Sequence, residues 1–423
     1  MYTCLHTSYP ALDGHPTSAV FYFKRRSFPL RLYGWDTLSA EWMVHRKEGV
    51  LLEIQSVETF PLYVPLREPY GDANGYKSYR SSFVIRIQSR SGLEGWGECA
   101  GWLPVLEKVF KEHIIPFLLG KKSTDRMELV KKVRKWYPGA AAGVSMALTE
   151  ILAKMAGVHV CDVWGGMSRR KIPVYASFQS YTNRSDWRQH SVNMVEEALT
   201  DGYTSIKVKI GAKTFQEDRA HIGALLNLVD NRVNVAIDAN ESYDVSTALR
   251  WNRLFAQWDN WLWFEEPVPM DNVSEYRVLR SRCQIPVSGG ENIQGAALFL
   301  PLAKNGSLDI IQPDVNHTGG VDAFREALQL ARHFGLRASP HCYDGALSRL
   351  YAAFAMGCLP SWSKMEEEDI EPVEWDVMEN PLNMLLPLKP VDGFIALPSG
   401  TGIGIELDKE LLKTYRWNGL GYV

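Results

Sequence analysis

Closely spaced cysteine pairs, long apolar runs and a strong excess of one charge are all missing from this 423-residue sequence. Its six cysteines include no C-x-x-C pair, which argues against a zinc ribbon or a disulfide scaffold and favours reduced thiols in a cytoplasm. No apolar run reaches the roughly 20 residues that span a bilayer, and the N-terminal residues do not resemble a signal peptide. A formal net charge of −3 gives no basic surface for nucleic acid or an anionic membrane. The expected partner is a small molecule.

The first part of the chain predicts a mixed α+β domain. Residues 1–50 show no sustained hydrophobic period and are interpreted as an N-terminal extension of unclear role. From residue 51 two segments alternate as strands do, LLEIQSVETFPLYVPL and FVIRIQS, and helical segments follow between about residues 105 and 168. This pattern predicts a capping domain over residues 51–170.

From residue 171 short strands alternate with amphipathic helical segments. Such alternation predicts parallel strands joined by crossover helices, and eight such units close into a β/α barrel. The predicted strands are PVYASF, SIKVKI, VNVAID, LWFEEP, PVSGGE, LDIIQPD, LRASPH and SWSKMEE, the last with weak alternation. The barrel is predicted to cover residues 171–374, and the Pro- and Gly-containing tail, residues 375–423, to return to the capping domain.

Charged residues stand at the ends of six consecutive predicted strands. Strand two ends in Lys207-Val208-Lys209, and the next five end in Asp238, Glu265, Glu291, Asp314 and His341. The last five are separated by 27, 26, 23 and 27 positions, and each step is about one strand–helix unit. In a barrel these side chains would share the C-terminal rim, where such folds hold their active sites. A helix cap or a solvated strand end would explain any one of them, but not the whole series.

The residue types in this series suit acid–base chemistry at a metal. Asp238, Glu265 and Glu291 form an all-oxygen ligand set, which favours Mg²⁺. Lys207 and Lys209 alternate along one strand and should both point into the barrel, where their repulsion is expected to lower the pKa of each. A lysine with a lowered pKa could act as a base near neutral pH. Asp314 and His341, on neighbouring strands, are placed to form a dyad.

The segments that carry these residues resemble the enolase superfamily, and within it the mandelate racemase subgroup. They are GYTSIKVKIG, VAIDANESYD, WFEEPVP, SGGEN, IIQPDVNHTGG and SPHCYDGALS. The resemblance runs from about Leu51 to the C-terminus. It implies an α/β fold, namely a modified TIM (β/α) barrel with an α+β capping domain formed by the N-terminal part and the C-terminal tail. It also implies a Mg²⁺ cofactor, a small carboxylate substrate and a homo-oligomer.

The resemblance also implies a role for each site residue. The metal ligands would be Asp238, Glu265 and Glu291, with Glu265 preferred to Glu266 because the family's ligand stands two residues before the proline. Lys209 would be the base on one face of the substrate and Lys207 a helper near its carboxylate. The acid or base on the opposite face would be His341, paired with Asp314.

Further candidate positions lie near the same rim, most of them implied by the resemblance. A glutamate ending strand eight would hydrogen-bond the enolate, and this residue is assigned as Glu366, with Glu367 as the alternative. Asn240 and Gln179 stand where the family contacts its substrate. His317 lies near the rim and is interpreted as a loop residue, with a role in substrate binding as the alternative.

The implied chemistry is removal of the proton α to a carboxylate, with the resulting ene-diolate stabilised by Mg²⁺ and neighbouring side chains. The favoured outcome is dehydration of an acid sugar, an aldonate or an aldarate, to a 2-keto-3-deoxy acid, because such dehydratases dominate the subgroup. The alternatives are a racemase or epimerase of a 2-hydroxy acid and a non-catalytic metal-binding barrel. Cycloisomerisation is disfavoured because the second-base position carries the His-Asp pair instead of a lysine on strand six. The cations Arg67, Lys77 and Arg80 in the cap would suit a second substrate carboxylate, as in an aldarate.

Overall fold

The computed structural model describes residues 52–229, 233–366 and 368–421. The predicted N-terminal extension, residues 1–50, and the alternative strand-eight residue, Glu367, lie outside the described residues. Within the described ranges, no helix combines the length and the apolar character needed to cross a membrane.

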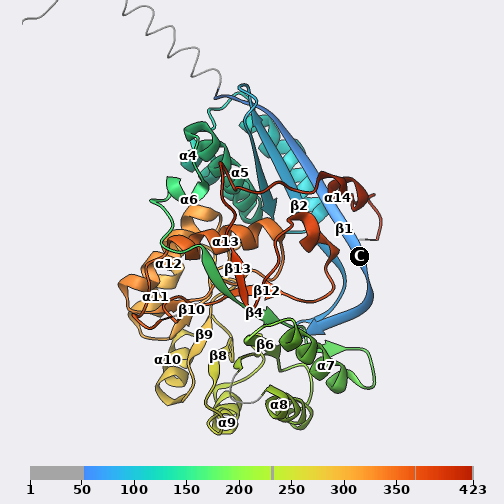
Figure 1. The fold of residues 1–423 in the computed structure, drawn as a ribbon, viewed down its shortest axis with the longest axis vertical. Coiled ribbons are helices and arrows are strands. Elements are labelled where there is room, and N and C mark those ends of the chain that lie inside the picture. Colours follow the sequence, from blue (N-terminus) through green and yellow to red (C-terminus); the bar gives the residue numbers. More distant parts are fainter. Residues whose placement is uncertain (1–51, 230–232, 367, 422–423) are drawn as a thin grey trace, which may run out of the picture. The chain divides into compact units, whose positions relative to one another are not determined.

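The capping domain is an antiparallel sheet covered by helices (Figure 1). Its strands lie in the order β3-β2-β1-β5, with bounds β1 Ile54–Asp72, β2 Gly75–Ser89, β3 Glu94–Cys99 and β5 Tyr181–Thr182. The helices that follow β3 are α2 Leu103–Val109, a π-helical turn Phe110–Ile114, α3 Ile115–Leu118, α4 Arg126–Trp136, α5 Pro138–Ala156 and α6 Val160–Val163.

Small residues allow α5 to lie directly on the sheet. A Cβ atom at Gly97 of β3 would come within 1.9 Å of the carbonyl oxygen of Gly143 in α5, so the two backbones touch where both residues are glycine. The helix begins with Pro138 in its first turn and ends before Gly157, whose φ of 69° provides the left-handed residue common at helix ends.

The barrel domain contains eight parallel strands in one curled sheet, in the order β12-β4-β6-β7-β8-β9-β10-β11. Their bounds are β4 Lys171–Ser177, β6 Ser205–Lys209, β7 Asn234–Asp238, β8 Trp261–Glu265, β9 Val287–Gly289, β10 Ile310–Ile311, β11 Arg337–Ala338 and β12 Val373–Asp376. Hydrogen bonds from Ala338 N to Glu371 Oε1 (2.6 Å) and from Ser339 Oγ to Pro372 O (2.7 Å) connect the two ends of this sheet. The predicted modified barrel with an α+β cap is confirmed.

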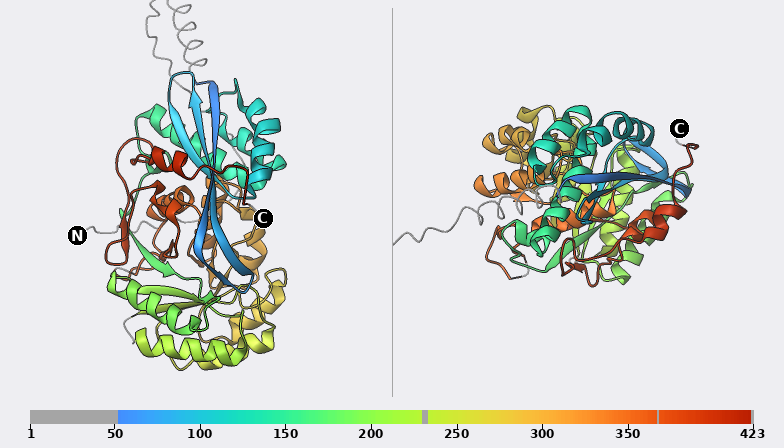
Figure 2. Two further views of the ribbon diagram at one scale, coloured as in Figure 1. Left: turned by 90° about the vertical axis from the view of Figure 1, so that its right-hand side faces the viewer. Right: turned by 90° about the horizontal axis from the view of Figure 1, so that it is seen from above.

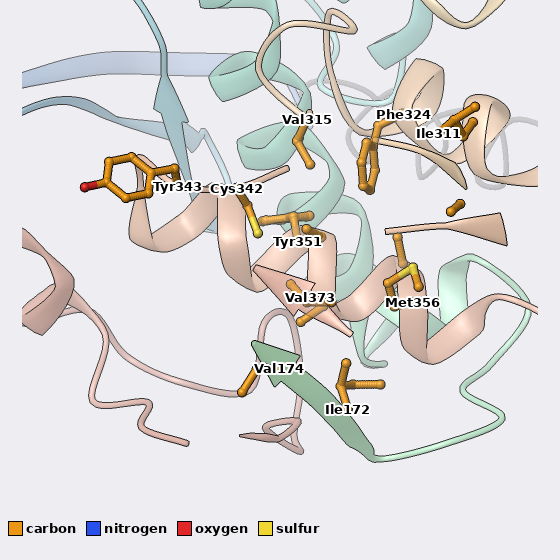
Figure 3. Packing of buried hydrophobic residues seen from close by; sticks show 14 of the residues in the cluster. Ile172, Val174, Ile311, Val315, Phe324, Cys342, Tyr343, Tyr351, Met356 and Val373 are labelled. Atoms are coloured by element: carbon orange, nitrogen blue, oxygen red, sulfur yellow. The ribbon is translucent and has the colours of Figure 1, made fainter. Parts of the chain in front are cut away.

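Helices cover the outside of the barrel (Figure 1). They are α7 Trp187–Thr200, α8 Phe215–Val229, α9 Val245–Phe255, α10 Val273–Arg282, α11 Phe299–Lys304, α12 Val321–His333 and α13 Ala346–Cys358. In α12 the buried residues recur at helical spacing, for example Val321, Phe324 and Leu328, which explains why this segment is an amphipathic helix. Figure 3 shows Phe324 in the core with Tyr351 of α13 and with Val174 and Val373 of neighbouring strands.

The C-terminal segment passes from the barrel back to the cap. After β13, Phe394–Ala396, which pairs antiparallel with β4, the chain reaches α14, Lys409–Thr414. Backbone hydrogen bonds from Tyr63 N to Tyr415 O (2.9 Å) and from Trp417 N to Pro61 O (2.8 Å) then attach it to β1. Figure 2 shows this segment, in red, beside the long blue strand β1.

The predicted strand eight is wrong. The described part of this segment, residues 361–366, lies in a surface loop, in which Trp362 N donates to Asp369 O (2.9 Å) and Ser363 Oγ donates to Glu368 O (3.0 Å). The strand is β12, in the sequence PVEWD, and it pairs with β4. Glu366 is therefore exposed on the loop instead of ending a barrel strand.

Candidate active site

The register of three parallel strands brings the first site residues together. Lys209 is the Cα partner of Asp238 across β6 and β7, and Asp238 is the partner of Glu265 across β7 and β8. All three residues end their strands, so their side chains reach the C-terminal rim at the same level. Lys207 lies two residues earlier in β6 and points into the same interior, where it is fully buried.

Three carboxylates form the centre of the site. Asp238, Glu265 and Glu291 each offer an oxygen atom, and these atoms lie within 4.8 Å of one another. Trp263 Nε1 (2.8 Å) and Gln312 Nε2 (2.6 Å) donate to Glu265 Oε2 and fix its orientation. Burial and the neighbouring Asp238 carboxylate raise the pKa of Glu265 to about 7.

This set fits a divalent cation. Glu291 Oε2 is buried and accepts no hydrogen bond from the residues that the structure describes. His341 Nε2 lies 3.4 Å from this oxygen, beyond a good hydrogen-bond distance, so a cation shared with the two neighbouring carboxylates would offset the cost of burying it. Three hard oxygen donors and no sulfur ligand favour Mg²⁺.

The neighbouring Glu266 supports the loop that carries Glu291. Glu266 Oε1 accepts hydrogen bonds from the backbone of Gly290 (2.9 Å) and Glu291 (3.3 Å). Glu265 therefore lies in the carboxylate cluster, whereas Glu266 contacts the following strand end.

The two lysines are held by carboxylates. Lys207 Nζ lies 2.7 Å from Glu265 Oε1 and 3.4 Å from Asp238 Oδ2, and Lys209 Nζ lies 2.5 Å from Asp238 Oδ2. Burial alone would lower the pKa of both lysines, but the carboxylates outweigh it and raise both pKa values above their ordinary range. Lys207 does lower the pKa of Lys209, as expected, but the predicted net lowering is wrong, because the prediction considered Lys207 and Lys209 without their acidic neighbours.

Asp314 and His341 form the predicted dyad. They are bridge partners across the ends of β10 and β11, and His341 Nδ1 lies 2.8 Å from Asp314 Oδ2. The other ring nitrogen, Nε2, faces the carboxylate cluster, 3.4 Å from Glu291 Oε2 and 3.7 Å from Glu374 Oε2. Burial would lower the pKa of His341, but the three neighbouring carboxylates outweigh burial and raise it to about 10.

Glu374 occupies the place that the sequence analysis gave to Glu366. It lies on β12, and its Oε1 is 3.0 Å from Lys207 Nζ and 2.7 Å from Ser177 Oγ. Its Oε2 accepts a hydrogen bond from Cys342 N (2.9 Å). Burial would raise the pKa of Glu374, but Lys207 and His341 lower it to about 2. The available signal was a single acidic residue between two apolar residues in PVEWD.

The residues assigned to substrate contact are buried near the strand ends. Gln179 follows β4 and Asn240 follows β7, where Asn240 has a left-handed φ of 42°. Both side chains have a buried oxygen, Gln179 Oε1 and Asn240 Oδ1, that accepts no hydrogen bond from any described residue. Such acceptors suit the hydroxyl groups of a polar ligand.

His317 lies in the loop that follows β10, beside the dyad. Its Nδ1 is 2.8 Å from the backbone oxygen of Glu291, and its ring stacks on His341 with centroids 6.3 Å apart. It also lines a cavity of about 490 Å³ between β2, β3 and the loops that follow β10 and β11. The cavity is large enough for a small-molecule substrate.

A barrel whose C-terminal rim combines a carboxylate cluster with acid–base groups is typical of enzymes that act on small carboxylates at a divalent metal. Residues 191–411 match the enolase C-terminal domain-like family. Residues 54–165 match the mandelate racemase / muconate lactonizing enzyme N-terminal domain. The chain therefore belongs to the mandelate racemase / muconate lactonizing enzyme family of the enolase superfamily.

Similar proteins include both dehydratases and cycloisomerases. D-galactarolactone cycloisomerase of Agrobacterium fabrum is 28% identical, over 86% of this chain and 99% of the relative. Arabinonate dehydratase of Saccharolobus solfataricus is 26% identical, over 79% of this chain and 90% of the relative. A racemase from Streptomyces coelicolor with bound magnesium has the same fold, with a TM-score of 0.74, 22% identity and coverage of 86% of this chain and 100% of that chain.

Proposed function

We propose that this enzyme removes the proton α to the carboxylate of an acid sugar and eliminates the β-hydroxyl, which gives a 2-keto-3-deoxy acid. The observation that carries the proposal is the position of Lys209 and His341 on different sides of one carboxylate cluster. Lys209 contacts Asp238, whereas His341 faces Glu291. A substrate carboxylate held at the cluster would have a basic group on one side and an acidic group on the other.

Asp238, Glu265 and Glu291 would hold Mg²⁺. When bound, the cation supplies positive charge that stabilises a substrate carboxylate as it gains negative charge, and it offsets the repulsion among its ligands. Lys207 Nζ, paired with Glu374, lies beside the cluster and would add a hydrogen bond and a further positive charge.

The proton steps would use Lys209 and the dyad. With a cation held by Asp238, the contact that raises the pKa of Lys209 would be weakened, and the neutral Lys209 Nζ would take the α-proton, so the C–H electron pair enters the carboxylate as an ene-diolate. His341 Nε2 gives its proton to the β-hydroxyl, the C–O bond breaks and water leaves, and the enol product rearranges to the keto acid. Asp314 keeps a hydrogen bond to His341 Nδ1 and orients the ring. The carboxylates of Asp314 and Glu374 beside the ring favour the protonated imidazole that this acid role requires.

Cycloisomerisation is the second candidate. The similarity to D-galactarolactone cycloisomerase favours it, although strand six carries the dyad residue Asp314. The same α-proton removal could begin that reaction, but its product has the same composition as its substrate. Racemisation would also keep the composition and would need His341 to return a proton to the α-carbon.

A substrate panel separates these reactions. Purified protein with Mg²⁺ would be incubated in D₂O with acid sugars, their lactones and 2-hydroxy acids, and followed by NMR and mass spectrometry. We expect one acid sugar to lose one water and give a keto acid. A product of unchanged composition from a lactone would favour the cycloisomerase, and α-deuterium without any other change would favour the racemase. Absence of deuterium and product with every compound, in protein that binds Mg²⁺, would contradict the proposed function.

A further inference from the structure

We propose that the end of the substrate farthest from the reacting carboxylate is uncharged, so that the enzyme acts on a monoacid of the aldonate type and discriminates against the diacid, the aldarate. This inference rests on the proposed function and narrows its substrate class. It reverses the expectation that the cap cations would bind a second carboxylate.

The cavity beside the dyad is the place for this distal end. Asn316 and His317 line it, and their backbone N–H groups donate to Asp314 Oδ1 at 2.6 and 3.3 Å. Asp344, three residues after His341, lines the same cavity. A substrate whose reacting carbon lies between the cluster and His341 would extend into this space.

Arg80 of β2 cannot offer the cavity a free guanidinium. Its side chain is only 2% exposed. Its Nη2 lies 3.0 Å from both carboxylate oxygens of Asp376 and 2.8 Å from the hydroxyl of Tyr343, and its Nε lies 2.6 Å from the hydroxyl of Tyr70. Its Nη1 lies 2.6 Å from Asp344 Oδ1. These contacts use most of the five N–H donors of the side chain.

Lys77 and Arg67 are also paired. Lys77 Nζ lies 3.0 Å from Asp344 Oδ2, so Asp344 lies between Lys77 and Arg80 and receives a bond from each. Arg67 is not among the residues that line the cavity, and its Nε lies 3.4 Å from Glu379 Oε1. None of these three cations is left with its charge uncompensated.

The cations that line the cavity are already paired with carboxylates. Its described lining contains two side chains with permanent positive charge, Lys77 and Arg80; Asp344 contacts both of them, and Arg80 also contacts Asp376. Burial raises the pKa of Glu98, the other carboxyl group of the lining. The Glu98 carboxyl is buried and accepts hydrogen bonds from Leu347 N (2.8 Å) and Ser348 N (3.3 Å). A second substrate carboxylate would therefore lie near Asp344 with no unpaired cation of the lining to bind it. The repulsion between the two negative charges would disfavour its binding.

Asn316 gives the cavity a preference for a hydroxyl group. Asn316 Nδ2 donates to Ser348 Oγ (2.9 Å), which leaves its Oδ1 as a buried acceptor without a hydrogen bond from any described residue. A substrate hydroxyl can donate to this oxygen, whereas an ionised carboxylate has no proton to donate. Charge and hydrogen bonding thus favour the same kind of distal group.

The test uses matched acids that differ only at the distal carbon, for example gluconate with glucarate and galactonate with galactarate. Binding of each acid to the Mg²⁺-loaded enzyme would be measured by calorimetry, independently of turnover. In the pair whose configuration is accepted, we expect the monoacid to bind at least about tenfold more tightly than the diacid. A diacid that binds as tightly as its monoacid, or more tightly, would overturn the inference.

The variant Asp344→Asn tests the cause. It removes the negative charge that neutralises Lys77 and Arg80, so we expect the preference for the monoacid to shrink by about tenfold, mainly through tighter binding of the diacid. Glu379→Gln is the matched control, because it removes a carboxylate that pairs with Arg67 outside this cavity. Its ratio of monoacid affinity to diacid affinity should equal that of the unmodified enzyme. An unchanged ratio in Asp344→Asn would contradict the electrostatic argument. Deuterium exchange at the α-carbon in the same samples reports separately on the proposed function.

Discussion

Lys207 Nζ lies 3.0 Å from Glu374 Oε1, and this contact connects β6 to β12 inside the barrel. The same lysine contacts Glu265, so it joins the carboxylate cluster to the strand that the sequence analysis misassigned. The glutamate of strand eight is therefore part of one buried charge network and not a separate group on the rim.

The first prediction compares Glu374→Gln with Glu366→Gln. The amide at position 374 cannot pair its charge with Lys207 or accept a proton, so we expect kcat to fall by about 10²-fold, similar to removal of one stabilising group in other active sites. Glu366 is exposed on a loop, and its variant should keep the activity of the unmodified enzyme. Steady-state kinetics of both variants show which glutamate takes part in catalysis. A decrease in kcat only in Glu366→Gln would support the original assignment of Glu366.

The sequence alone could align candidate residues on one rim where each residue ends its strand. Asp238 and Glu265 close strongly apolar strands, and one βα unit of spacing was enough to align them on one rim. Glu374 was missed because it lies within a four-residue strand with little alternation, and because pairing with β4, nearly 200 residues earlier, defines that strand. The prediction of the fold class rests on the repeated alternation of strands and helices, so the error in strand eight did not change it.

Ion pairs between residues far apart in the chain could not be predicted from the sequence for a similar reason. Arg80 and Asp376 are separated by 296 positions, and only packing of the cap on the barrel brings them into contact. The lysine pKa values were likewise predicted from Lys207 and Lys209 alone, while the decisive neighbours lie on other strands.

The second prediction concerns metal binding. At a Mg²⁺ concentration of about 100 times its Kd, binding to the folded state should raise Tm by about 3 °C. Asp238→Asn should abolish this rise, because it removes one of the three clustered carboxylates. Asp186→Asn, at an exposed aspartate paired with Arg184, should keep it. Thermal scans with Mg²⁺ and with EDTA measure the effect, and an equal rise in both variants would place the cation elsewhere.

The third prediction concerns the ion pair between cap and barrel. Arg80→Met would leave Asp376 buried with its main cationic partner removed, and we expect the free energy of unfolding to fall by about 3–5 kcal/mol. Arg67→Met breaks an exposed pair with Glu379 and should cost less than about 1 kcal/mol. Urea unfolding measures both, and equal small losses would show that the buried pair contributes little.

The fourth prediction is a pH dependence of stability. Burial and nearby Arg188 lower the pKa of His221 from 6.5 to about 4, and His221 Nε2 lies 2.9 Å from Ser191 Oγ. Below about pH 6.5 the unfolded chain binds a proton that the folded protein does not bind until about pH 4, so stability falls as pH decreases through this window. The difference corresponds to about 3 kcal/mol.

His221→Gln keeps a hydrogen-bonding side chain but cannot titrate. Between pH 7 and pH 4 the free energy of unfolding of the variant should decrease by about 3 kcal/mol less than the free energy of unfolding of the unmodified protein decreases. His333→Gln, at an exposed histidine, is the control and should follow the unmodified protein. Parallel curves for His221→Gln and the unmodified protein would assign the acid sensitivity to other groups.

The most direct measurement of the central claim is the rate of deuterium incorporation at the α-carbon of an accepted acid in D₂O with Mg²⁺. We expect Lys209→Ala to lower this rate by about 10²–10⁴-fold, whereas Lys304→Ala, at an exposed lysine, should leave it unchanged. His341→Asn should still incorporate deuterium but form no keto acid, since Lys209 remains and the proton donor for the leaving hydroxyl is lost. Exchange at the unmodified rate in Lys209→Ala would contradict the assignment of Lys209 as the base and the mechanism built on it.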